Sequence, residues 1–237
     1  MLSVKNLKKE YGKFKIDKVS FSVERGKITG LIGNNGAGKT TVLKCVIWVL
    51  QYDFGEIIID GLRLGHHEEE YKEKIGIVFD SGYFYENLTL EEMKKIISAA
   101  YRNWDEEVYQ GYLKNYKLDS KLKIETLSQG MKMKYALALA LSHNAEILIF
   151  DEPTSGLDPK TRQLFCEEMI DQKKHGRTIL FSTHITSDLD KIGDNIILMD
   201  RGRILKEATK QEFLMGESTV EAAMVNLITE GGKAWKY

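Results

Sequence analysis

The sequence predicts an α/β fold, with a mainly parallel β-sheet, a small antiparallel layer beside it and a helical insertion. Three patterns support this prediction. Short apolar runs alternate with helix-like stretches, which favours a parallel sheet. Strand-like runs near the start are broken by glycines, as in antiparallel hairpins. The middle of the chain has a helical pattern instead. The length of 237 residues suits a single domain, 1–237.

Two sets of apolar runs define the expected strands. The parallel sheet is expected from Lys27–Ile32, Ile75–Phe79, Ile147–Phe150, Thr178–Ser182 and Ile196–Met199. The antiparallel layer is expected from Ser3–Leu7, Ile16–Val23 and Glu56–Ile59, where apolar and polar side chains alternate. The α/β core and its antiparallel layer are therefore assigned to about residues 1–80 and 145–205.

The helical insertion is expected over about residues 81–144. Its candidate helices are Leu90–Ala100, Glu106–Tyr116 and Gly130–Leu141. The remaining segment, 206–237, is expected to be a tail whose amphipathic stretch Ser218–Thr229 forms a short helix.

The charge balance argues against a nucleic-acid partner. The chain has 34 Lys and Arg against 35 Asp and Glu, so no basic footprint for a phosphate backbone is expected. Cys45 and Cys166 lie in helix-like runs and fit small buried hydrophobic residues in a reducing compartment. No apolar run reaches the roughly 20 residues that span a bilayer. Action at a membrane would therefore need another subunit.

A phosphate-binding loop is predicted where the strand Lys27–Ile32 runs into Gly-Asn-Asn-Gly-Ala-Gly-Lys-Thr. This fits G-x-x-x-x-G-K-[ST] between a strand and a helix. Backbone N–H groups of such a loop curl around a β-phosphate, Lys39 reaches the β- and γ-phosphates, and the Thr40 hydroxyl is a ligand for Mg²⁺. The alternative is a glycine-rich turn that caps a helix. The predicted nucleotide-binding residues here are Asn34, Asn35, Gly36, Ala37, Gly38, Lys39, Thr40 and Thr41.

Two acids, Asp151 and Glu152, follow the apolar strand Ile147–Phe150. Burying charged side chains at the end of an apolar strand costs free energy, which suggests that they have a function. The carboxyl edge of an open α/β sheet is where nucleotides bind. We expect Asp151 to hold Mg²⁺ through water and Glu152 to orient, or accept a proton from, the attacking water. The alternative is that Asp151 only caps a turn. Both motifs predict nucleotide hydrolysis without choosing among kinases, GTPases, helicases and transport motors.

Further motifs resemble those of the ABC ATPase family. Leu127–Met131 reads Leu-Ser-Gln-Gly-Met and resembles the signature L-S-G-G-Q, and Ser155–Asp158 resembles the D-loop. His184, after Ser-Thr, resembles the switch histidine, and Tyr11 resembles the aromatic residue that stacks on adenine. The resemblance spans Tyr11 to His184 in the family's order.

The resemblance implies a RecA-like P-loop NTPase core, with the signature in the helical insertion, and ATP and Mg²⁺ as cofactors. Two ATPase subunits, identical or siblings, would stack head to tail around two ATP molecules. Ser128 and Gly130 of one subunit would face the phosphates bound by the other, while His184 would contact the γ-phosphate and hold Glu152 in place. A separate transmembrane permease would keep the chain at the cytoplasmic face of the cell membrane.

The sequence departs from the family in two places. Asp80 stands where a Gln usually reaches Mg²⁺, and we expect it to take that role, although it could instead cap the turn before Gly82. The signature reads Ser-Gln-Gly-Met, which keeps Ser128 and Gly130. With the single-cassette length, these features resemble ATPases of bacterial ABC-2-type exporters. They imply export of a peptide or drug-like substrate.

Two alternative functions stay open. One is an ABC ATPase of cofactor assembly. The other is a nucleotide-binding regulator without turnover, although the presence of Glu152 and His184 argues against it. The run His66–Glu70 is expected to be a solvated loop rather than a metal site. The aromatic cluster of Tyr83, Phe84 and Tyr85 is expected either in the core of the helical insertion or as a docking surface for the permease.

Overall fold

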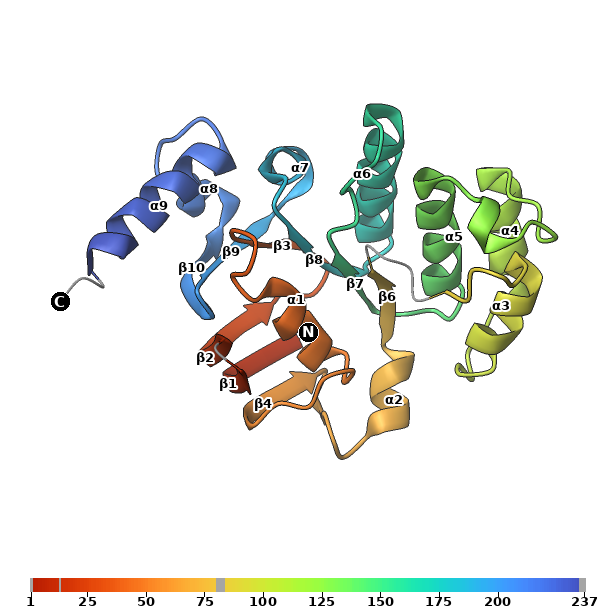
Figure 1. Ribbon diagram of the computed structural model, residues 1–237, viewed down its shortest axis with the longest axis horizontal. Coiled ribbons are helices and arrows are strands. Elements are labelled where there is room, and N and C mark those ends of the chain that lie inside the picture. The colour runs from red at the N-terminus through yellow and green to blue at the C-terminus, as the bar shows by residue number, and fades with distance from the viewer. Residues whose placement is uncertain (1, 13, 80–83, 235–237) are drawn as a thin grey trace.

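The main framework of the protein, in a computed structural model that describes residues 2–12, 14–79 and 84–234, is a six-stranded sheet (Figure 1). Its strand order is β10-β9-β3-β8-β7-β6. The strands are β3 (Ile28–Ile32), β6 (Ile75–Phe79), β7 (Ile147–Asp151), β8 (Thr178–Thr183), β9 (Asn195–Asp200) and β10 (Arg203–Thr209). All neighbours are parallel except β10, which pairs antiparallel with β9. The mainly parallel sheet is confirmed, and each predicted strand bound is within one residue.

The register of this sheet brings several strand ends to one edge. Asp151 at the end of β7 pairs with Ser182 of β8, and Thr183 pairs with Ile32 at the end of β3. Every residue of β3, β7 and β8 is buried, as expected for parallel strands covered on both faces. Polar groups that follow these strands therefore emerge together at the carboxyl edge.

The antiparallel layer is a second sheet of order β2-β1-β4-β5. Its strands are β1 (Leu2–Tyr11), β2 (Phe14–Val23), β4 (Phe54–Ile59) and β5 (Leu62–Arg63). It packs with α1 (Lys39–Val46) against one face of the main sheet, in a core that includes Leu7, Leu43 and Ile149. The strands β1 and β2 are longer than predicted because they continue into a hairpin.

Helices cover the other face of the main sheet. They are α6 (Pro159–Lys174), α7 (Thr186–Ile192), α8 (Lys210–Leu214) and α9 (Val220–Ala234). Phe150 of β7 and Phe181 of β8 pack against Phe165 of α6 in this second core. The predicted tail helix corresponds to α9, and β10 was not predicted.

The segment between β6 and β7 is helical and has its own core (Figure 1). It contains α3 (Leu90–Ser98), α4 (Glu106–Tyr116), a 3₁₀ turn (Ile124–Thr126) and α5 (Gln129–Leu141). Side chains of Thr89, Asp105 and Ser128 cap the three α-helices, which explains why the predicted helix bounds lie close to the observed ones.

The run His66–Glu70 is exposed, as predicted, but it does not form a loop throughout. Glu68–Glu73 forms the helix α2, with His67 as its N-cap. The buried Tyr71 anchors this helix by donating its hydroxyl hydrogen to the Val46 carbonyl at 2.8 Å. The acids in the first turn also suit the positive end of the helix dipole.

Both cysteines are buried and unpaired. Burial raises the pKa of the Cys45 and Cys166 thiols to about 11, so both are neutral at pH 7 and act as small apolar side chains. Within residues 2–12, 14–79 and 84–234, no helix is long and apolar enough to cross a bilayer.

Candidate active site

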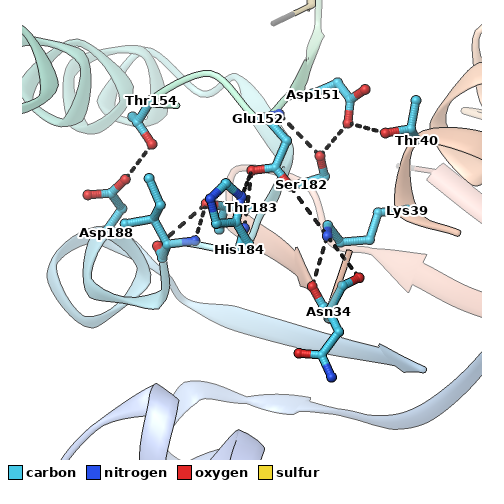
Figure 2. Close-up of polar contacts among 12 residues, drawn as sticks. Asn34, Lys39, Thr40, Asp151, Glu152, Thr154, Ser182, Thr183, His184 and Asp188 are labelled. Atoms are coloured by element: carbon cyan, nitrogen blue, oxygen red, sulfur yellow. Dashed lines mark hydrogen bonds and ion pairs between the residues drawn. The ribbon is translucent and has the colours of Figure 1, made fainter. Parts of the chain in front are cut away.

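The phosphate loop joins β3 to α1 and directs the Lys39 side chain back over its own backbone. The ammonium Nζ donates to the Gly33 carbonyl at 2.8 Å and lies 3.5 Å from the Asn34 carbonyl (Figure 2). It also lies 3.3 Å from Glu152 Oε1. Lys39 is only 5% exposed, so this cation is held among acceptors rather than in water.

Two glycines of the loop are required for different reasons. Gly33 has φ +155, and a Cβ there would lie 2.1 Å from the main-chain oxygen of Met199 in β9. Gly36 has φ +81, but an added Cβ would meet nothing within 4 Å. Gly33 therefore provides space between strands, whereas Gly36 provides only a left-handed backbone.

Asp151 links three segments of the chain at the carboxyl edge. Its Oδ1 accepts hydrogen bonds from Thr40 Oγ1 at 3.1 Å and from Ser182 Oγ at 2.5 Å. Ser182 is fully buried and was not among the predicted site residues. Its position just before Thr183 and His184, at the end of a strand next to β7, was the signal that could have identified it.

Glu152 lies between the phosphate loop and His184 in a left-handed backbone conformation, with φ +50. Such a conformation costs a residue other than glycine about 1–2 kcal/mol. The Glu152 N–H donates to Ser182 O at 3.1 Å and lies 3.2 Å from Ser182 Oγ, which holds the turn. Oε2 accepts from the His184 N–H at 3.1 Å and lies 2.7 Å from His184 Nδ1 (Figure 2). The carboxylate thus bridges Lys39 and the imidazole.

An open cavity of about 570 Å³ lies over these groups. It is lined by Phe14, Asn35, Gly36, Gly38, Lys39, Thr40, Thr41, Glu152, Ser155 and His184. Tyr11 pairs with Phe14 across the β1–β2 hairpin and is 63% exposed, but Phe14 is the aromatic residue that lines the cavity. Phe14 was not among the predicted site residues, although its place close to Tyr11 in the sequence was a usable signal.

The signature segment lies outside this cavity. Ser128 caps α5 and accepts a hydrogen bond from the Met131 N–H at 3.3 Å. Gly130 packs on Thr161 at the start of α6, where an added Cβ would lie 3.1 Å from Thr161 Cγ2. Ser128 and Gly130 are not among the residues that line the cavity. Asp80, and with it Tyr83, falls outside the described residues, so the role predicted for Asp80 stays a prediction.

The pair Thr40 and Asp151 fits a magnesium ion. A hydroxyl and a carboxylate oxygen 3.1 Å apart are the hard ligands that Mg²⁺ prefers. In the part of the chain that the structure describes, no group of three or more His, Cys, Asp or Glu side chains could hold a metal alone. Mg²⁺ bound here would therefore also need phosphate oxygens, whose charge it would partly neutralise.

The comparisons with known proteins agree with this geometry. The sequence model of the family described as "ABC transporter" matches residues 16–155. The linearmycin resistance ATP-binding protein LnrL of Bacillus subtilis (strain 168) is 34% identical to this chain, over 97% of the chain and 76% of that protein. The Nod factor export ATP-binding protein I of Ralstonia nicotianae is 30% identical, over 92% of the chain and 70% of that protein.

Solved structures with the same fold include an ATP binding subunit of an ABC transporter. It is 31% identical, with a TM-score of 0.87, over 96% of this chain and 99% of that one. A dimeric ATP-binding cassette in a post-hydrolysis state, bound to ADP and Pi, is 25% identical with a TM-score of 0.77. That match covers 88% of this chain and 98% of the cassette.

The two loop glycines give a matched test of this geometry. Gly33→Ala is expected to lower the free energy of unfolding by about 3 kcal/mol, because the new methyl group must push β3 away from β9. Gly36→Ala is expected to cost only about 1 kcal/mol, from left-handed strain without a clash. Urea denaturation of both variants measures the difference, and equal losses would contradict the described packing.

Proposed function

This chain belongs to the ABC transporter family of ATP-binding proteins, and from that premise we propose that it drives a separate membrane permease, which exports a peptide or drug-like substrate. The contacts of one side chain support hydrolysis most directly. The Glu152 carboxylate is held between the Lys39 ammonium and His184, at the sheet edge where the phosphate loop begins. An acid in contact with the cation expected at the β- and γ-phosphates suits hydrolysis of the terminal phosphate.

Each group at this edge has a chemical part in the proposal. The loop N–H groups and Lys39 bind the phosphates, and Thr40 and Asp151 hold Mg²⁺. Glu152 orients the attacking water or accepts its proton. His184 keeps the carboxylate in place through its main-chain N–H and its ring, and contacts the γ-phosphate.

A second ATPase subunit completes each site in this proposal. Ser128 and Gly130 lie outside the cavity of their own chain, at the N-terminus of the 13-residue helix α5. A helix N-terminus and a hydroxyl favour an anion, so this end suits the phosphates bound by a partner copy. The dimeric cassette among the similar structures supports the presence of a second subunit.

An apolar pocket of about 290 Å³ supports a permease docking surface on the helical segment. It is lined by residues of β6, α3 and α5 with their neighbours, among them Ile77, Ile97 and Leu139. Two members of the aromatic cluster differ in burial. Phe84 packs on Tyr135 with ring centroids 5.3 Å apart, whereas Tyr85 is 62% exposed. We assign this surface to a cytoplasmic segment of the permease, which would hold the chain at the membrane.

The names of the relatives, linearmycin resistance and Nod factor export, support export rather than import. The competing function is an ABC ATPase of cofactor assembly. Purifying the complex from its host and identifying the co-purifying chains separates the two. A polytopic membrane chain supports transport, and a complex without one favours the competing function.

Glu152→Gln tests the hydrolytic role. The variant is expected to bind ATP with an affinity near that of the wild type and to hydrolyse it about 10²–10⁴ times more slowly, because it lacks the base or water-orienting carboxylate. ATP that is not hydrolysed would stay between two subunits. Light scattering is therefore expected to show dimers of this variant with ATP, and largely monomers of the wild type. Turnover near that of the wild type would contradict the role of Glu152.

A mixing experiment tests the shared site. Ser128→Arg and Lys39→Ala are each expected to be inactive alone, because one blocks the partner's γ-phosphate and the other removes the cation of the phosphate loop. A mixed dimer contains one composite site with an intact loop and an intact signature. Turnover is expected to return when folded samples are mixed with ATP. Mixtures as inactive as their parents would count against the head-to-tail arrangement.

A further inference from the structure

A buried acid that none of the roles above uses lies beside the active site. Asp188 in α7 is fully buried, and its Oδ2 accepts a hydrogen bond from Thr154 Oγ1 at 2.6 Å (Figure 2). Thr154 is fully buried as well. The second carboxylate oxygen, Oδ1, has no hydrogen-bond partner within the described part of the chain.

A buried acid of this kind is not expected to increase the stability of the fold. Removing a carboxylate from water is costly, and a single side-chain hydrogen bond returns only part of that cost. Two apolar side chains of similar volume usually serve stability as well or better. Unlike apolar packing, a hydrogen bond is directional, so it fixes the position of two segments relative to each other.

The two segments joined by this bond carry the two groups assigned to hydrolysis. Thr154 follows Glu152 by two residues, and Asp188 follows His184 by four. On the strand side, the Glu152 N–H is tied to Ser182. On the other side, the bond between Thr154 and Asp188 ties the same turn to α7. In the second segment, His184 lies between the two residues that make these bonds, Ser182 and Asp188, and in the first segment Glu152 itself makes one of them.

We propose that Thr154 and Asp188 are positioning residues for ATP hydrolysis. Their buried hydrogen bond holds the turn that carries Glu152 against the segment that carries His184, so that carboxylate and imidazole stay in contact while phosphate binds. This inference rests on the proposed roles of Glu152 and His184. The competing account is that the pair only secures α7 to the body of the protein.

The decisive variant is Thr154→Val, which keeps the shape of the side chain and removes its hydroxyl. Turnover at saturating ATP is expected to fall roughly tenfold, the rate equivalent of one lost hydrogen bond. The ATP affinity and KM are expected to stay within twofold, because neither residue lines the nucleotide cavity. Thr154→Ser restores the hydroxyl and is expected to restore turnover to within twofold of the wild type.

Thr178→Val is the matched control. Thr178 begins β8 at the opposite end from Thr183, is 3% exposed, and accepts a hydrogen bond from the Gly26 N–H at 3.0 Å. The control also loses a hydroxyl and one hydrogen bond, here a part-buried bond from a main-chain N–H, so its melting temperature should fall while its turnover stays within twofold. Thr154→Ala is a second test variant if the valine is poorly accommodated, and it is expected to lose turnover in the same way.

All rates are measured on folded protein, below the melting temperature of each variant, with Glu152→Gln alongside. If Thr154→Val and Thr154→Ala both hydrolyse ATP within twofold of the wild-type rate while Glu152→Gln is inactive, the inference is overturned. The proposed function then stands. Equal losses in the Thr154 variants and Thr178→Val also overturn it, since general destabilisation would then explain the rates. An active Glu152→Gln contradicts the proposed function instead.

Discussion

The Asp151 carboxylate is the contact on which the rest of the site depends. It accepts hydrogen bonds from Thr40 at the start of α1 and from Ser182 at the end of β8, while its own strand lies between β6 and β8. The parallel register makes this meeting possible, because neighbouring strands end level with each other. With Asp151 fixed, the next residue, Glu152, must emerge between Lys39 and His184. One buried acid thereby positions both the proposed metal ligands and the proposed hydrolytic group.

The fold separates the groups that we propose to bind phosphate into two places. The cavity over Lys39 is built from the main sheet and its loops, whereas Ser128 belongs to the helical segment. Gly130 nevertheless packs on Thr161, and Asp158, whose pKa is lowered by hydrogen bonds from Thr161, caps α6 just beyond the turn that carries Glu152. The signature segment is therefore packed against α6, which begins just after the turn that carries Glu152.

Local sequence determined much of the fold and of the candidate site. Apolar strands, capped helices and the phosphate loop each depend on neighbours within a few residues, so their bounds could be predicted closely. Ser182, Phe14 and the pair Thr154–Asp188 were not predicted, because their contacts arise where separate segments of the chain meet. The helix α2 was missed for the same reason, since its anchor is the bond from Tyr71 to Val46.

In the proposed arrangement, one chain holds two incomplete halves of an ATPase site. The most direct test is the turnover per chain of the purified wild-type protein as a function of its concentration. If two copies must meet to complete a site, turnover per chain rises with concentration and then saturates. If one copy suffices, turnover per chain stays constant through the range in which light scattering shows only monomers, and that result would contradict the account.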